Sequence, residues 1–383
     1  MLWLICSAGL FLALAYVFEI ARNLRNWQQL PGYEPVPDFR ISTRISVVIP
    51  ARNEARNIGA CLQSLLNQSY PPGEMEVIVV DDFSTDGTPD LVLQCKDPRV
   101  RLLELRNFMS EERGNAFKKK ALETGIAAAS GTLIATTDAD CVLPECWLSM
   151  FAAEYQENQA VFIAGPVGFC EEQNLLERFQ SLDYLGMMIL TGAAIRRGQA
   201  NLSNGANLAY PKAVFEAVGG FSGIDHLASG DDMLLLQKIT KQYPPDHIRF
   251  VKNAGALVRT RAKSTLPEFL SQRLRWASKS AAFRSPDLLW TLSVVFLLCW
   301  AIILSPVFAL VFGTGFLYAG LLLFAFKSAA DYALLSTACR HFGRRDLLRS
   351  FWPSQLLHIA YIAFIGVASM FRKRYSWKGR SVK

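Results

Sequence analysis

The stretch GTLIATTDADC, residues 131–141, decides the fold that the sequence predicts. Leu133 to Thr137 read as a buried strand, and the stretch then ends in two carboxylates, Asp138 and Asp140, separated by one alanine. In an extended chain, residues two apart point to the same face, so the two carboxylates are predicted to lie close together. No lysine or arginine stands in the stretch to offset their repulsion. A divalent cation such as Mg²⁺, which takes one or two protein carboxylates together with phosphate oxygens, would offset it; a solvated aspartate-rich turn is the alternative.

Strands and helices alternate around this stretch, from Ile45 to about Asn253. ISVVIP (45–50), EVIVVDD (76–82) and VRLLEL (100–105) are rich in strand formers, whereas NIGACLQSLL (57–66) has the apolar spacing of a helix. This alternation predicts an α/β fold with a mostly parallel sheet that helices cover on both faces. Ligands of such sheets bind beyond the carboxyl ends of the strands.

Polar residues follow three of the predicted strands at that edge: Arg52 to Glu54, then Asp81 with Asp82, then Asp138 with Asp140. Together they predict one cleft, with a nucleotide base and ribose on one side and a metal-bound diphosphate on the other. Each segment also has a structural explanation, because DDFSTDGT (81–88) is a good turn sequence and KKK (118–120) is either a solvated helix face or a cation near phosphate. The absence of G-x-x-x-x-G-K-[ST] and G-x-G-x-x-G patterns counts against P-loop and dinucleotide-binding enzymes.

Two later segments are predicted to complete the site. Asp231 and Asp232 begin an apolar helix in SGDDMLLLQKI (229–239), where they either cap the helix or supply a general base. In LPEFLSQRLRWASKS (266–280), Gln272, Arg275 and Trp276 gather opposite an apolar face formed by Leu266, Phe269, Leu270, Leu274 and Ala277. This helix is predicted to lie on the membrane surface, with Arg275 meeting phosphate and Trp276 stacking on a sugar or lipid-linked acceptor. A simple interfacial anchor is the alternative.

The chain is too apolar for an ordinary soluble enzyme. Of its 383 residues, 51% are hydrophobic and 19% are charged. Residues 288–326 carry no charge, which is enough for two spans of about 20 residues each, and further apolar runs cover residues 2–20 and 351–371. The net charge of +7 is concentrated beside these runs and in the tail, so we expect it to meet lipid headgroups and not nucleic acid.

The charges around the apolar runs predict the topology. Arg22 and Arg25 follow the first run and no basic residue precedes it, which favours an uncleaved anchor over a signal peptide, with the chain in the cytoplasm from residue 22 onward. Three later spans would leave the basic tail outside, against the charge rule. Either one later segment is re-entrant or interfacial, or the rule fails; we favour a cytoplasmic tail.

Read in order, these motifs resemble those of membrane-bound family 2 glycosyltransferases, which have the GT-A fold. The resemblance covers about residues 44–280. It rests on VVIPARNE (47–54), VVDDFSTDGT (79–88), DAD (138–140), NGANLAY (204–210), GDD (230–232) and the Q-x-x-R-W set Gln272, Arg275 and Trp276. Each motif is weak alone, but their order is specific.

The resemblance implies a role for each motif. Asp82, with Asp81 beside it, would contact the nucleoside, and Asp138 and Asp140 would hold the nucleotide and Mg²⁺ or Mn²⁺. Asp232 would be the catalytic base, and Asp231, which stands where glutamate is common, is the less favoured base. Lys118 is a doubtful donor-binding residue, because the usual G-K before AL is missing. The other substrate-binding residues would be Pro50, Ala51, Asn53, Glu54, Gly205, Gln272, Arg275 and Trp276.

The predicted organisation is an N-terminal transmembrane anchor (1–24), a linker (25–43), a cytoplasmic GT-A domain (44–265), an amphipathic interface helix (266–286), C-terminal transmembrane segments (287–371) and a basic tail (372–383). The expected activity is metal-dependent, inverting hexosyl transfer from a nucleoside diphosphate sugar, expected to be UDP-linked, to a lipid, lipid-linked or polysaccharide hydroxyl in a bacterial plasma membrane. The alternatives are a nucleotidyltransferase, and a membrane transporter or binding subunit with a nucleotide-sugar-sensing domain.

Overall fold

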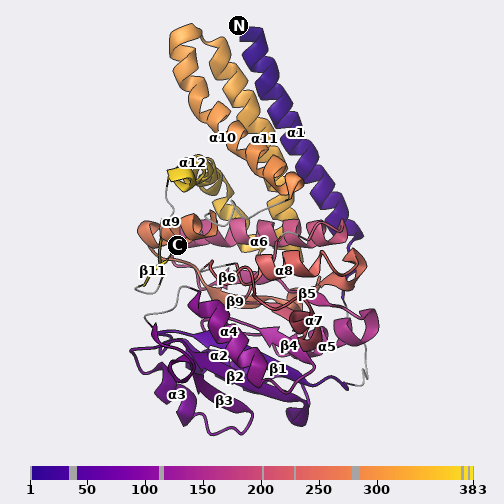
Figure 1. Cartoon of the computed structure of the whole chain (residues 1–383). Helices are drawn as coiled ribbons and strands as arrows, with labels where there is room; N and C mark the ends of the chain where they lie inside the picture. Colours follow the sequence, from indigo (N-terminus) through magenta and orange to yellow (C-terminus); the bar gives the residue numbers. More distant parts are fainter. Residues whose placement is uncertain are drawn as a thin grey trace. The chain divides into compact units, whose positions relative to one another are not determined.

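The computed structural model describes residues 2–33, 41–111, 116–200, 202–227, 230–277, 285–371, 375–377 and 380–382 (Figure 1). It divides into two compact units. One comprises Met1–Gln29, Glu171–Ala193 and Ala262–Tyr375, and the other comprises Leu30–Cys170, Ala194–Arg261 and Ser376–Lys383. The C-terminal tail therefore belongs to the same unit as the first strands of the chain.

This second unit is built on a seven-stranded sheet of order β3-β2-β1-β4-β7-β5-β8. Its strands are β1 (Ile45–Ala51), β2 (Met75–Asp81), β3 (Val100–Glu104), β4 (Leu133–Thr136), β5 (Phe162–Ala164), β7 (Leu208–Pro211) and β8 (Ile248–Phe250). Strands β1 to β4 pair in parallel, whereas β7 runs antiparallel to β4 and β5. The predicted α/β fold with a mostly parallel sheet is confirmed.

One helix of this unit brings its first turn to the carboxyl edge of the sheet. The unit's helices are α2 (Ile58–Leu66), α3 (Thr88–Gln94), α4 (Phe117–Ala128), α5 (Trp147–Asn158), α7 (Lys212–Ala217) and α8 (Met233–Ile239). Helix α4 packs directly on β1 and β2 because Gly125 has no side chain, and a Cβ there would lie 2.4 Å from Val48 Cγ1. Two small sheets complete the unit, one of β6 (Val167–Cys170) with β9 (Val258–Arg261) and one of β10 (Tyr375–Trp377) with β11 (Arg380–Val382).

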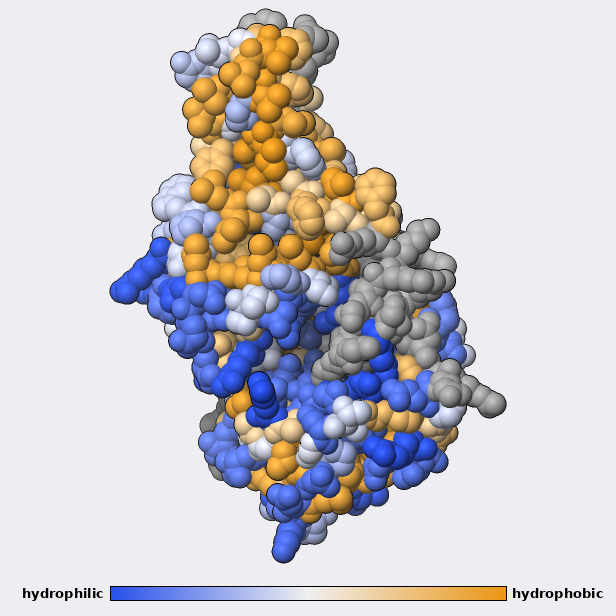
Figure 2. Space-filling view, turned by 90° about the vertical axis from the view of Figure 1, so that its left-hand side faces the viewer, coloured by the Kyte–Doolittle hydropathy of each residue, from blue (hydrophilic) through white to orange (hydrophobic). Residues whose placement is uncertain are grey.

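The first unit is helical and includes long apolar helices. Its main elements are α1 (Leu2–Gln29), most of α6 (Leu175–Arg196), α9 (Leu266–Ala277), α10 (Pro286–Phe312), α11 (Gly315–His341) and α12 (Phe351–Phe371). Among the described residues, four segments are long and apolar enough to cross a membrane: Cys6–Gln29, Pro286–Phe312, Gly315–His341 and Arg345–Phe371. In Figure 1, α1, α10 and α11 run side by side, whereas α12 is seen almost end-on. At the height of α1, α10 and α11 the surface is mostly hydrophobic (Figure 2).

A charged pair lies inside these apolar helices. Lys327 of α11 donates a hydrogen bond of 2.5 Å to Asp331, one turn further along the same helix, and both side chains are buried. Tyr16 of α1 and Gln355 of α12 also donate to the Asp331 carboxylate. Because isolated charges are costly in an apolar helix bundle, this network stabilises the pair and ties three helices together.

Candidate functional site

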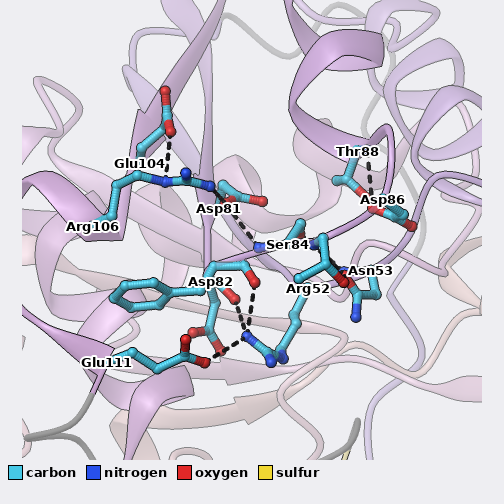
Figure 3. A network of polar contacts seen from close by, with 12 residues as sticks. Arg52, Asn53, Asp81, Asp82, Ser84, Asp86, Thr88, Glu104, Arg106 and Glu111 are labelled. Carbon is cyan, nitrogen blue, oxygen red and sulfur yellow. Dashed lines mark hydrogen bonds and ion pairs between the residues drawn. The ribbon is translucent and has the colours of Figure 1, made fainter.

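The loops that follow β1 and β2 are tied together at the carboxyl edge of the sheet (Figure 3). Asn53 adopts a left-handed conformation, with φ at 52°. Its N–H donates to Ser84 Oγ (3.0 Å), and its side-chain oxygen accepts from the Thr85 N–H (2.8 Å). The Glu54 N–H donates to Thr88 Oγ1 (2.8 Å). Asn53 and Glu54 therefore shape the loop at this edge of the sheet.

The end of β1 itself supplies backbone to the edge. Pro50 and Ala51 pair in register with Val80 and Asp81 of β2. The next residue, Arg52, was not assigned from the sequence, although it lies within the ARNE motif. Its guanidinium donates to the backbone carbonyl oxygens of residues 82 (2.8 Å) and 83 (2.9 Å), as Figure 3 shows. Arg52 thus holds the turn that follows β2.

Asp81 and Asp82 are both buried at the end of β2 but have different surroundings. Asp81 Oδ2 accepts from the Ser84 N–H (3.1 Å) and lies 3.9 Å from the Arg106 guanidinium. Asp81 Oδ1 is buried and has no hydrogen-bond partner among the residues that the structure describes. Burial raises the pKa of Asp82 to about 6, and the Arg380 guanidinium acts in the opposite direction. Asp81 is therefore the carboxylate with an unused acceptor.

Lys118, in the first turn of α4, joins two of the predicted acids. Its Nζ lies 2.8 Å from Asp138 Oδ1 and 3.1 Å from Asp231 Oδ2. Burial alone would lower the pKa of Lys118, but the two carboxylates raise it above its ordinary value, so the amine carries its charge at neutral pH. Lys118 therefore contacts the predicted acids although the G-K pattern before it is missing.

Asp232 lies beside this pair and caps α8. Its Oδ1 accepts from the Met233 N–H (2.7 Å) and its Oδ2 from the Gly205 N–H (3.2 Å). Gly205 leaves almost no room for a side chain, because a Cβ would lie 3.0 Å from Asp231 Oδ2 and 3.3 Å from Lys118 Nζ. Four separate segments therefore meet here, as the motif order predicts.

Asp138 and Asp140 follow β4 in a different geometry from the predicted one. The strand ends at Thr136, and residues 139 and 140 form a turn. The prediction that the two carboxylates follow each other in an extended chain is therefore wrong. Both side chains are half-buried. Burial raises the pKa of the nearby Cys61 thiol, and the negative charges of Asp140 and Asp138 raise it further.

Two carboxylates of this kind fit a Mg²⁺ or Mn²⁺ ion that takes its remaining ligands from phosphate and water. Across the described residues, no group of three or more His, Cys, Asp or Glu side chains gathers that could hold a metal. An ion held by Asp138 and Asp140 would take its remaining ligands from phosphate and water.

The Q-x-x-R-W residues lie on α9, in the other unit. The Trp276 ring stacks on Tyr184 of α6, with centroids 5.6 Å apart. Gln272 Oε1 is buried and accepts no hydrogen bond from the described part of the chain. Arg275 is half-buried on the same helix. Contacts of these residues with diphosphate or acceptor remain predictions, and residues 278–284 of the predicted 266–286 helix lie outside the described residues.

The buried face of α9 differs from the predicted apolar face. Leu266 is 54% exposed, whereas Phe269 and Arg273 are buried. Arg273 Nη2 lies 2.9 Å from Asp183 Oδ2, and its guanidinium carbon lies 4.6 Å from the centre of the Trp276 ring. The spacing of apolar residues in α9 cannot predict that Arg273 is buried, because the acid that pairs with it, Asp183, lies on another helix.

Arg380, in the tail strand β11, is a further residue that the sequence analysis missed. Its Nη1 donates to both oxygens of the Asp82 carboxylate (2.8 and 2.9 Å), and its Nη2 donates to Glu111 Oε1 (2.6 Å). The guanidinium carbon lies 3.7 Å from the centre of the Phe117 ring. The expectation that the basic tail meets lipid headgroups is therefore wrong for Arg380.

Comparisons with known proteins identify the family and the fold. Residues 46–219 match the profile of glycosyl transferase family 2, and residues 133–365 match that of glycosyl transferase family group 2. Glycosyltransferase AglE of Haloferax volcanii is 31% identical over 198 residues, which cover 51% of this chain and 61% of AglE. The probable glycosyltransferase YdaM of Bacillus subtilis is 25% identical over 284 residues, which cover 72% of this chain and 63% of YdaM. The chain thus spans less than two thirds of either relative.

Among solved structures, the mannosyltransferase PcManGT from Pyrobaculum calidifontis, in complex with GDP-Man and Mn²⁺, is similar in fold. The TM-score is 0.55 at 22% identity, and the match covers 97% of this chain and 99% of that chain. A likeness at this identity shows a shared GT-A fold.

Proposed function

Because the chain belongs to the family 2 glycosyltransferases, we propose that it transfers a sugar, with inversion, from a nucleoside diphosphate sugar to a lipid, lipid-linked or polysaccharide hydroxyl. One observation carries the proposal: Lys118 joins Asp138 to Asp231 at the carboxyl edge of the sheet, next to Asp232. An edge of this kind is where α/β proteins bind nucleotides.

The nucleoside would bind at the end of β2. The unpaired Asp81 Oδ1 supplies a buried acceptor for an N–H of the base, and an unmade hydrogen bond at such a group is costly enough to favour a ligand that makes it. UDP-linked sugars are the expected donors; uracil offers a ring N–H for this carboxylate oxygen, as guanine also does, whereas adenine and cytosine do not.

The diphosphate would bind beside Lys118 and the D-x-D turn. Asp138 and Asp140 would hold Mg²⁺ or Mn²⁺ there, and the Mn²⁺ of the mannosyltransferase with the same fold supports this choice. When bound, the ion stabilises the negative charge that develops on the departing diphosphate. Lys118, whose amine contacts Asp138, adds a further positive charge next to the diphosphate.

Asp232 would act as the general base. It accepts the proton of the acceptor hydroxyl while that oxygen attacks the anomeric carbon and the bond from this carbon to the diphosphate oxygen breaks. Its two backbone hydrogen bonds orient the carboxylate, which has further lone pairs for the proton. Asp231 is less suited to this task because it is committed to Lys118.

The test is release of nucleoside diphosphate by the full chain purified in detergent. UDP- and GDP-linked sugars are supplied one at a time with Mg²⁺ or Mn²⁺ and a membrane lipid extract as the acceptor source. We expect metal-dependent release from one donor. No release from any donor would overturn the proposal, and formation of pyrophosphate from a nucleoside triphosphate and a sugar phosphate would show a nucleotidyltransferase instead.

We infer further that the catalytic unit and the tail lie on the cytoplasmic side of a bacterial plasma membrane. The contact of Arg380 with Asp82 requires the tail to return to the side of the catalytic unit, although α10, α11 and α12 lie between them in the chain. If α10, α11 and α12 all crossed the membrane, the tail would end on the side opposite the catalytic unit. Since α12 runs crosswise to α10 and α11, it is the helix that we propose to lie in the interface (Figure 1).

Reporter fusions would test this topology. A fluorescent protein fused after residue 383 should be fluorescent, and alkaline phosphatase at the same position should be inactive, because both would be cytoplasmic. The same reporters inserted at Gly313, in the α10–α11 turn, should give the opposite pattern. Active phosphatase at residue 383 would contradict the inference.

A further inference from the structure

We propose that strand β11 lies at the wall of the donor pocket and that its Arg380 is a positioning residue for the nucleoside. This inference rests on the proposed function, because it assumes that a nucleoside binds at the end of β2. It assigns a task to a tail that is separated by nearly 300 residues from the loop that it contacts.

Arg380 is held by three segments that line this end of the sheet. Its side chain is only 11% exposed and pairs with Asp82 after β2 and with Glu111 in a separate loop. Its planar guanidinium stacks on the ring of Phe117, which begins α4, and this ring in turn packs edge-on against Phe83 at 6.0 Å. Nη1 donates to Asp82 while Nε and Nη2 donate to Glu111, and these contacts together with the stacking hold the planar guanidinium in one orientation.

The two neighbouring aspartates then have separate tasks. Arg380 contacts both oxygens of Asp82, whereas Asp81 Oδ1 has no hydrogen-bond partner in the described ranges. A base can therefore donate to Asp81 while Arg380 stays on Asp82. The tail and the nucleoside occupy adjacent positions and do not compete for one carboxylate.

The charges at this end of the sheet support the same conclusion. The acids are Asp81, Asp82, Glu104 and Glu111, and the arginines within ion-pair distance of them are Arg52, Arg106 and Arg380. Without Arg380 the acids exceed the arginines by two, and a donor that carries a negative diphosphate would be repelled. Arg380 therefore lowers the electrostatic cost of binding the donor.

The experiment compares the full chain with Arg380→Ala, Arg380→Lys and the control Arg101→Ala. Arg101 is half-exposed on β3 and pairs with Glu76, so its replacement removes one positive charge away from the site. Calorimetric titration with UDP, GDP, ADP and CDP in the presence of Mn²⁺ gives affinities without requiring turnover.

We expect Arg380→Ala to weaken binding of the preferred nucleotide about tenfold, the loss of one charge-assisted contact. Arg380→Lys should lie between Arg380→Ala and wild type because lysine keeps the charge but not the planar fork. Arg101→Ala should bind as wild type does. With the donor sugar, KM should rise in Arg380→Ala while kcat at saturation stays near wild type, which a general loss of structure would not produce.

Equal or tighter nucleotide binding by Arg380→Ala would overturn the inference, since the tail would then be a bystander or a plug. If Arg380→Ala does not fold, Arg380→Lys and Arg380→Gln decide the matter, because both weaken the Arg380 contacts and should both lower affinity. Wild-type protein that binds none of the four nucleotides would overturn the proposed function as well, so the two failures are distinguishable.

Discussion

Replacing Asp232 by asparagine is expected to lower kcat about 10²- to 10⁴-fold, the usual contribution of a general base. Asparagine has nearly the same shape and keeps one oxygen to accept a backbone N–H at the start of α8, but it cannot accept the proton of an acceptor hydroxyl. Nucleotide affinity should stay near wild type, because Asp232 accepts from the Met233 and Gly205 N–H groups, and Lys118 keeps its ion pairs with Asp138 and Asp231. Turnover at saturating donor and calorimetric nucleotide binding separate the two effects.

Asp231→Asn is the informative companion variant. It breaks the 3.1 Å contact with Lys118 and should therefore act mainly on donor KM. Asp97→Asn is the control, since Asp97 pairs with Arg99 within its own loop and should leave turnover unchanged. If Asp231→Asn abolishes turnover and Asp232→Asn does not, the two assignments are reversed.

The sheet and the position of the site follow from local sequence. The run of strand formers before Asp138 and the one that ends in Asp81 and Asp82 give parallel strands whose ends share an edge, and all three acids lie there. What fails is the fine geometry at the strand end. The chain turns at residues 139–140, and no residue type in TTDADC forces the strand to stop at Thr136.

Long-range partners could not be predicted. Arg380 stands in a short basic tail, where single-sequence reasoning favours lipid headgroups, and its partner Asp82 is 298 residues away. Arg273 was overlooked for the same reason, because Asp183 lies on a distant helix. Hydropathy predicts the length of α12 but not the orientation of its axis, because that orientation depends on packing against α10 and α11.

Replacing Asp140 by asparagine is expected to remove metal-dependent turnover, lowering kcat/KM by about 10²- to 10³-fold, as loss of several kcal/mol of charge stabilisation implies. An amide is a weaker ligand for Mg²⁺ and Mn²⁺ than a carboxylate, and only two acids, Asp138 and Asp140, are proposed to hold the ion. Electron paramagnetic resonance of Mn²⁺, titrated into protein with and without UDP or GDP, measures binding of the ion independently of activity.

Because Lys118 remains in Asp140→Asn, the variant should still bind nucleotide in the absence of metal, and the added affinity that Mn²⁺ gives to wild type should be lost. Asp246→Asn, at an exposed position before β8, is the matched control and should keep both Mn²⁺ binding and turnover. Unchanged Mn²⁺ binding in Asp140→Asn would place the ion elsewhere. Unchanged turnover with Mn²⁺ binding lost would instead show that Lys118 alone supplies the positive charge at the diphosphate, a metal-independent transfer.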